Sequence, residues 1–227
     1  MAFALLTLSL PLQSADARAP KRGGEHIAGQ FDYYALVLSW SPTFCEGSQG
    51  SRNASQCDVR RRARPYAFVL HGLWPQYERR WPEFCRTRER PFVPRKTIDS
   101  MMDIMPSRRL IIHEYKKHGT CTGYDPQRYY LIARKFYEFI KIPDRYKRLD
   151  KPLVVTQDEL RRDLLAVNPG LRAKHLSFVC RGSGNRLREI RICFTRTGKL
   201  RACGANENQR RLCRSRKMFM PPVRFGR

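Results

Sequence analysis

Eight cysteines constrain the fold of this 227-residue chain more than any other feature. None of them forms a CxxC pair, and no set of cysteines and histidines has the spacing of a zinc finger. An even number of cysteines without metal-ligand spacing favours disulfides, and therefore folding in an oxidising compartment. The eight residues can pair in many ways, so the residues alone leave the connectivity open.

The beginning of the chain agrees with export. Residues 2–12 form an apolar run too short to span a bilayer, and small residues follow it up to Ala19. This pattern resembles a secretory signal peptide, although it lacks the usual basic start. We expect residues 1–17 to be the signal peptide, with cleavage after Ala17; cleavage after Ala19 is the alternative. No other segment is long and apolar enough to cross a membrane, so the sequence predicts a soluble protein that is secreted or periplasmic.

The charge balance points to a polyanionic partner. Lys and Arg number 45 against 20 Asp and Glu, which gives a formal net charge of +25. Solubility requires far less, so the excess predicts attraction to a polyanion. Nucleic acid is the first candidate, and an anionic surface or glycan is the alternative.

Hydrophobic patterning predicts strands on either side of a helical middle section. We expect strands at residues 31–40, 67–70, 175–180, 189–195 and 201–203, and loops at 41–65 and 76–95. Strands, then helices, then strands indicate a single α+β domain with a central antiparallel sheet flanked by helices. We place the domain at residues 20–215. The basic segment from Arg210 should be mobile, with residues 216–227 as a tail.

Capping residues mark three helices between those strands. Ser107 is a candidate N-cap for a helix that Gly119 should end. Asp125 and Pro126 have the order expected at the start of a second helix. Residues 156–159 (TQDE) form a capping box for a third helix, which an Asn-Pro-Gly turn at 168–170 should end.

Two short stretches contain three of the five histidines. His71 begins HGLWP, directly after an expected strand, and HEYKKHGTC covers residues 113–121. In a helix His113 would share one row with Lys117, and Glu114 would share the adjacent row with His118. Two imidazoles with a cation and an anion beside them suit acid–base chemistry on a phosphate.

A zinc-protease site is the nearest competing interpretation. The HExxH motif places both histidines at i and i+4. Here Lys117 occupies the i+4 position and His118 comes one residue late, so its ring turns away from His113. An adjacent ammonium would also repel a cation. We therefore expect no metal and no cofactor.

Together the two stretches resemble the active-site segments of the T2 family of secreted ribonucleases. HGLWP and HE-x-x-KHG-x-C match without a gap, and the FDYY…SWSPTFC opening, the NPG turn and the REIRICF strand extend the likeness over roughly residues 30–215. Bacterial members are the most similar. The resemblance implies a metal-independent endoribonuclease of broad specificity that cleaves single-stranded RNA to 2′,3′-cyclic phosphate ends.

The resemblance also implies a role for each residue of the two stretches. His118 would be the base that takes the proton of the 2′-hydroxyl, and His71 the acid that protonates the leaving 5′-oxygen. Lys117 and Glu114 would stabilise the phosphorane, and His113 would hold the phosphate. We expect the protein to act as a monomer on RNA.

Base recognition is less defined by the resemblance. Trp74 is either a core tryptophan or a surface for the base 5′ to the cut. Gln76 stands where some members have an acidic residue that selects purines, and Ser39 stands where some have glutamine. These three residues are the candidate substrate-binding residues, and base preference stays open.

Four disulfides follow from the same resemblance: Cys45–Cys57, Cys85–Cys121, Cys180–Cys213 and Cys193–Cys203. The second would hold the two histidine stretches in register. The rival interpretation of the whole chain is a cationic protein that binds RNA or another polyanion, or acts on membranes, without catalysis.

Overall fold

The computed structural model describes residues 26–48, 50–58, 65–88 and 90–224. The expected signal peptide at residues 1–17 and its alternative cleavage site lie outside the described residues. Within these ranges no helix has both the length and the apolar character needed to cross a membrane.

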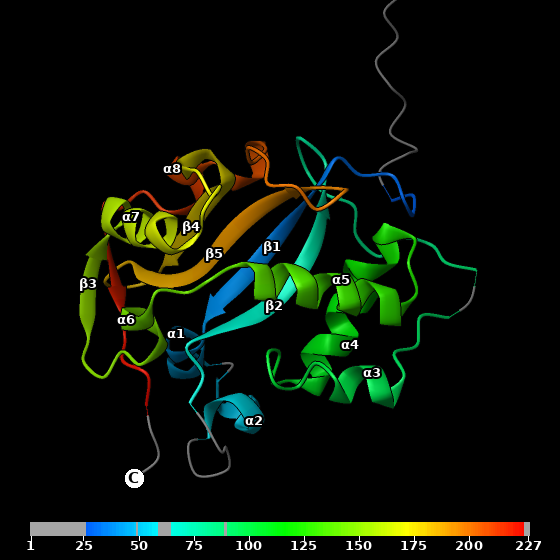
Figure 1. Ribbon diagram of the computed structural model, residues 1–227. Coiled ribbons are helices and arrows are strands. Elements are labelled where there is room, and N and C mark those ends of the chain that lie inside the picture. The colour runs from blue at the N-terminus through cyan, green and yellow to red at the C-terminus, as the bar shows by residue number, and fades with distance from the viewer. Residues whose placement is uncertain (1–25, 49, 59–64, 89, 225–227) are drawn as a thin grey trace, which may run out of the picture.

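A six-stranded sheet forms the centre of the domain (Figure 1). Five strands follow the order β2-β1-β5-β6-β3, and β4 also pairs with β5. Their bounds are β1 (Tyr33–Trp40), β2 (Phe68–Gln76), β3 (Leu153–Thr156), β4 (Leu176–Arg181), β5 (Arg186–Thr195) and β6 (Lys217–Met220). These strands pair antiparallel, except for a short parallel contact between β5 and β6. The predicted α+β class is confirmed, with a sheet that is mostly rather than wholly antiparallel.

The two faces of β1 contact different parts of the protein. Side chains alternate across a strand, and Tyr34, Leu36 and Leu38 join the main hydrophobic core on one face. Val37 and Ser39 lie on the other face, which the catalytic candidates share. Both faces are covered, which explains why the sequence of this strand is apolar almost throughout.

Capping residues set the starts of the three main helices as predicted. The Ser107 hydroxyl accepts from the Leu110 amide at the start of α4 (Arg108–Lys117). Asp125 caps α5 (Pro126–Phe139), and a complete capping box at Thr156 opens α7 (Gln157–Val167). The shorter helices are α1 (Ser41–Glu46), α2 (Ala54–Cys57), α3 (Arg95–Asp99), α6 (Asp144–Lys147) and α8 (Gln209–Leu212). Single turns of 3-10 helix are η2 (Gly50–Arg52), η3 (Gly119–Thr122), η4 (Ala173–His175) and η5 (Ala205–Glu207).

Three local predictions were wrong. Residues 41–58 contain α1, η2 and α2 instead of an uninterrupted loop, with Ser41-Pro42 starting the first helix. Residues 201–203 form no strand. Gly119 does not stop the chain in a left-handed turn: the helix passes directly into η3, and Gly123 takes the positive φ of 76°.

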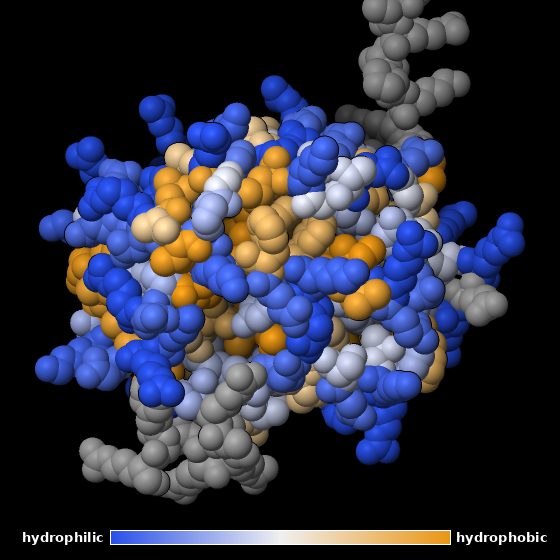
Figure 2. Space-filling model, viewed as in Figure 1, coloured by the Kyte–Doolittle hydropathy of each residue, from blue (hydrophilic) through white to orange (hydrophobic). Residues whose placement is uncertain are grey.

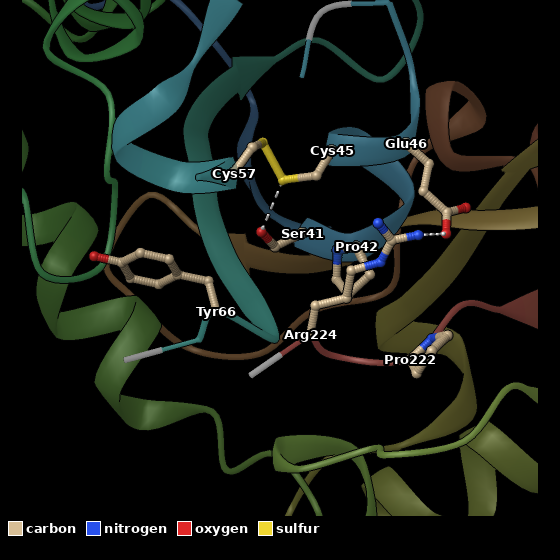
Figure 3. Close-up of a pocket in the computed structure, with 8 residues that line it drawn as sticks. All are labelled: Ser41, Pro42, Cys45, Glu46, Cys57, Tyr66, Pro222 and Arg224. Atoms are coloured by element: carbon tan, nitrogen blue, oxygen red, sulfur yellow. Dashed lines mark hydrogen bonds and ion pairs between the residues drawn. A yellow bond between two sulfur atoms is a disulfide. The ribbon is translucent and has the colours of Figure 1, made fainter. Parts of the chain in front are cut away.

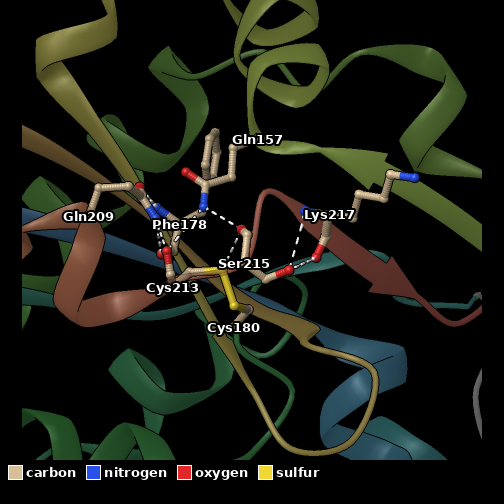
Figure 4. Close-up of a disulfide and its surroundings, with 7 residues drawn as sticks. All are labelled: Gln157, Phe178, Cys180, Gln209, Cys213, Ser215 and Lys217. Carbon is tan, nitrogen blue, oxygen red and sulfur yellow. Dashed lines mark hydrogen bonds between the residues drawn. A yellow bond between two sulfur atoms is a disulfide. The ribbon is translucent and has the colours of Figure 1, made fainter.

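The segment after Arg210 belongs to the sheet rather than to a mobile tail. Strand β6 pairs with β3, and Met218 and Met220 are fully buried. Figure 4 shows the segment that leads into β6, where the side-chain amide of Gln157 donates hydrogen bonds to the Cys213 and Ser215 carbonyls. This strand is only four residues long and lies between basic residues and two prolines, so its pattern is weak in the sequence. Residues 225–227 lie outside the described part.

The four disulfides join the same cysteine pairs that the resemblance implied: Cys45–Cys57, Cys85–Cys121, Cys180–Cys213 and Cys193–Cys203. The first lines a pocket of about 340 Å³ between α1 and the segment after β6 (Figure 3). The third ties β4 to the segment between α8 and β6 (Figure 4). Two of the four disulfides, those of Cys180 and Cys193, therefore fasten later segments to the sheet. Figure 2 shows hydrophilic residues over most of the visible face, with hydrophobic ones between them.

Candidate active site

A β-bulge places His71 on the face of the sheet that carries Val37 and Ser39, which we call the functional face. Leu70 pairs with Leu38 and Gly72 with Val37, so His71 has no partner on β1. In a regular strand residues i and i+3 point to opposite faces, which would separate His71 from Trp74. The extra residue of the bulge brings both rings to one face, with centroids 5.3 Å apart. The prediction that His71 follows the strand was wrong: it lies within β2.

Helix α4 lies beside β2 and supplies the second stretch (Figure 1). Its two side-chain rows are as predicted from helical spacing. Glu114 and His118 form the inner row and are only 2% and 4% exposed. His113 and Lys117 form the outer row, with the Lys117 ammonium 3.5 Å from the carboxylate of Glu83.

Trp74 connects the two stretches directly. Its indole N–H donates to Glu114 Oε2 at 2.7 Å, and its ring stacks on His118 with centroids 5.0 Å apart. Glu114 Oε1 lies 3.6 Å from Nε2 of His71. The acid and base candidates are therefore held on either side of one tryptophan and one carboxylate. This contact joins β2 directly to α4, and the Cys85–Cys121 disulfide joins the loop after β2 to η3.

Gly72 makes this close approach possible. A Cβ at this position would lie 2.1 Å from Glu114 Oε2 and 2.6 Å from the indole nitrogen of Trp74. Side chains larger than hydrogen are excluded unless the carboxylate or the strand moves. The glycine of HGLWP is thus a requirement of packing against α4.

The candidate residues line two adjoining cavities. One of about 470 Å³ is lined by His71, Trp74, Gln76, Trp81, Leu110, His113, Glu114, Lys117, His118 and Arg191. The other, of about 430 Å³, shares His71, Leu110 and His113 and adds Ser39, Phe44, Arg52, Asn53, Gln56, Val69, Ser107 and Arg109. The structure therefore brings all eight predicted catalytic and substrate-binding residues to one continuous region.

The other two substrate-binding candidates, like Trp74, have protein partners. The Ser39 hydroxyl lies 3.2 Å from Nδ1 of His71. The Gln76 amide donates to the Pro75 carbonyl and accepts from Asn206. Ser39 adjoins the imidazole, whereas Gln76 is buried at the floor of the larger cavity.

The two imidazoles have opposite electrostatic environments. Burial, followed by the charges of Lys117 and the other histidines, lowers the pKa of His118 to about 2. Burial alone would lower the pKa of His71 as well, but the hydrogen bond to Glu189 and the charges of Glu114 and Glu189 outweigh it and raise the pKa. Near neutral pH His118 is therefore unprotonated, while His71 is biased toward its protonated form. Such divergence separates a base from an acid.

Three further residues near the two imidazoles bear on the chemistry and were not among the sequence-predicted site residues: Glu189, Arg191 and Trp81. Glu189 and Arg191 come from β5, and Trp81 comes from the loop after β2. The first two are charged residues at i and i+2 on either side of the buried Ile190, a signal that the sequence does contain. Trp81 is about half exposed at 48%, and its arginine-rich surroundings carry no comparable signal.

Solved structures share this fold. The RNase-related protein from Calystegia sepium superposes with a TM-score of 0.63 at 19% identity, covering 86% of this chain and 99% of that one. RNase NT in complex with 5′-AMP gives a TM-score of 0.59 at 22% identity, covering 86% and 100%. The protein therefore has the same α+β fold as these two structures.

Sequence comparison identifies the family. The model of the Ribonuclease T2 family matches residues 31–203. A ribonuclease of Aeromonas hydrophila is 36% identical over 194 residues, covering 81% of each chain. Ribonuclease I of Escherichia coli is 31% identical over 230 residues, covering 83% of this chain and 84% of its own. The chain belongs to the Ribonuclease T2 family and is a ribonuclease.

Proposed function

We propose that this ribonuclease cleaves single-stranded RNA by transesterification, with His118 as base and His71 as acid. The observation that carries the proposal is the opposite protonation bias of two imidazoles that line one cavity. The base must begin unprotonated and the acid protonated, and each environment favours the form that its role requires.

In the proposed reaction His118 takes the proton of the ribose 2′-hydroxyl, and the 2′-oxygen forms a bond to the neighbouring phosphorus. The bond from phosphorus to the 5′-oxygen breaks, and that oxygen takes a proton from His71. The products are a 2′,3′-cyclic phosphate and a 5′-hydroxyl. The substrate supplies the nucleophile, so the protein needs only to move protons and stabilise charge.

Stabilisation of the phosphorane falls to Lys117, His113 and Glu114, which line the same cavity as the two imidazoles. Lys117 and His113 form the outer row of α4, where they can face phosphate oxygens. Glu114 is held by the indole N–H of Trp74, and burial raises its pKa. Preorganised donors and charges of this kind contribute most where negative charge develops.

The two cavities would receive the bases on either side of the cut. We propose Trp74 and Gln76 as contacts in the larger cavity and Ser39 in the smaller one. The half-exposed ring of Trp81 adds a surface on which a base can stack without sequence selection. Such contacts suit broad specificity.

The same proposal places the protein outside the cytoplasm, as a secreted or periplasmic enzyme. All eight cysteines are paired in disulfides. Disulfides persist in oxidising compartments, and the apolar start of the chain suits export.

Digestion of a defined oligoribonucleotide, with its termini identified by mass spectrometry, tests the reaction. We expect 2′,3′-cyclic phosphate ends from the wild type and their loss in His71→Ala and His118→Ala. His175→Ala is the matched control, because His175 lies in η4 outside both cavities. Near-wild-type cleavage by either active-site variant, or strong inhibition of the wild type by EDTA, would contradict the mechanism. RNA binding without cyclic ends would instead support the non-catalytic alternative.

A further inference from the structure

Strand β5 contributes two charged side chains to the face that carries His71. Glu189 pairs with Ser39 across the ladder and Arg191 pairs with Val37, so both lie on the functional face of the sheet. Their side chains are only 14% and 17% exposed. Charged groups are rarely buried to this extent unless they are paired, so their partners indicate their task.

The contacts form a chain that ends on the imidazole. Glu189 Oε1 lies 3.3 Å from Nδ1 of His71. Its other oxygen accepts two hydrogen bonds from Arg191, from Nε at 3.2 Å and Nη2 at 3.0 Å. The guanidinium in turn lies 4.9 Å from the ring centroid of Trp74 and 3.8 Å from Glu207 Oε1. Each group therefore has a fixed partner on both sides.

We propose that Glu189 is a positioning residue for the acid His71. This role rests on the proposed function, because it assumes that His71 donates a proton. A hydrogen bond from Nδ1–H to Glu189 fixes the ring and leaves Nε2 to carry the proton that is transferred. A carboxylate behind an imidazole also stabilises its protonated form.

The charged groups that face His71 come from two elements. Helix α4 and its C-cap residue His118 provide Glu114, along with the cationic or titrating groups His113, Lys117 and His118 itself. Strand β5 provides Glu189 and Arg191. The two carboxylates favour the imidazolium, and the cations oppose it.

Glu189 is the carboxylate suited to this task over a wide pH range. Burial would raise its pKa, but the hydrogen bond and charge of His71 and the contacts with Arg191 lower the pKa to about 2. Burial instead raises the pKa of Glu114. Glu189 therefore stays ionised under conditions in which Glu114 takes up a proton.

A purely structural role, in which Glu189 only links β5 to β2, makes a different prediction. Loss of a structural link lowers activity by the same factor at every pH. Loss of the carboxylate behind the acid lowers the pKa of His71, so activity falls first on the alkaline side. The position of the alkaline limb of kcat/KM therefore separates the two roles.

Two variants should move that limb in opposite directions. Glu189→Gln keeps a hydrogen-bond acceptor but removes the charge, so the alkaline limb should move to lower pH, with a loss of about tenfold on that limb and a smaller loss at acidic pH. Arg191→Met removes a cation that opposes the imidazolium, so the limb should move to higher pH even if turnover falls. Glu78→Gln is the matched control, because this exposed carboxylate pairs with Arg201 away from His71.

The pH profiles of kcat/KM on a dinucleotide and NMR titration of the His71 ring are the measurements. Opposite shifts in both observables, with an unchanged control, support the role. The role is overturned if the alkaline limb stays in place in folded, active variants. It is also overturned if the limb moves in the same direction in both variants. If Glu189→Gln does not fold, the pH profile of Arg191→Met and the titration of His71 in that variant decide the question. Absence of cyclic-phosphate products from the wild type would instead refute the proposed function itself.

Discussion

Gly72→Ala tests the packing of β2 against α4. The new methyl group would lie 2.1 Å from Glu114 Oε2, so either the carboxylate or the strand must move. Both movements break the 2.7 Å hydrogen bond from Trp74. Leaving the carboxylate of a residue only 2% exposed without this donor costs about 2 kcal/mol of stability. A displacement of about 1 Å at His71 lowers turnover about 100-fold.

A double-mutant cycle shows whether the loss passes through Glu114. We expect Gly72→Ala to lower kcat on a dinucleotide about 100-fold and to lower the melting temperature. In the Glu114→Ala background the nearer obstruction is absent, and the indole of Trp74, 2.6 Å from the new methyl group, no longer has a carboxylate that holds it in place; the additional loss from Gly72→Ala should therefore fall below about tenfold. Equal losses in both backgrounds would refute the reasoning, as would a fully active Gly72→Ala enzyme. Circular dichroism confirms that each variant is folded.

Two further predictions concern protons and the disulfide nearest the site. Burial lowers the pKa of His118, so the acid limb of wild-type kcat/KM should lie well below the ordinary pKa of histidine. Carboxylates raise the pKa of His71, so the alkaline limb should lie above the ordinary pKa of histidine. An acid limb near neutrality would contradict this assignment. Replacing Cys85 and Cys121 by alanine opens a loop with a sequence separation of 36 and should cost about 4 kcal/mol in denaturant unfolding. A loss below about 1 kcal/mol would show that the bridge is not constraining the unfolded chain.

Several features of the site could be predicted from sequence because they depend on neighbours along the chain. The two rows of α4 follow from helical spacing, and the caps at Ser107, Asp125 and Thr156 follow from hydrogen bonds within one turn. The acid–base interpretation of the two histidine stretches likewise needed only residue types and their spacing.

The pairing of strands was harder to predict from the sequence, because it depends on residues that are far apart along the chain. The short strands β3 and β6 are recognisable only through their pairing, which joins residues more than 60 positions apart. Neither was predicted, and the basic residues around β6 favoured a tail instead. Pairing energy between distant segments leaves little trace in local pattern.

The sequence by itself determined which chemical groups the active site contains and how α4 presents four of them. Only the tertiary structure decided their surroundings. The bulge at His71 turns that ring toward Trp74, and β5 brings Glu189 behind it from 118 positions further along the chain. The physical reason is register: a side chain's face and its cross-strand neighbours depend on how distant strands align, and these neighbours set the protonation of His71.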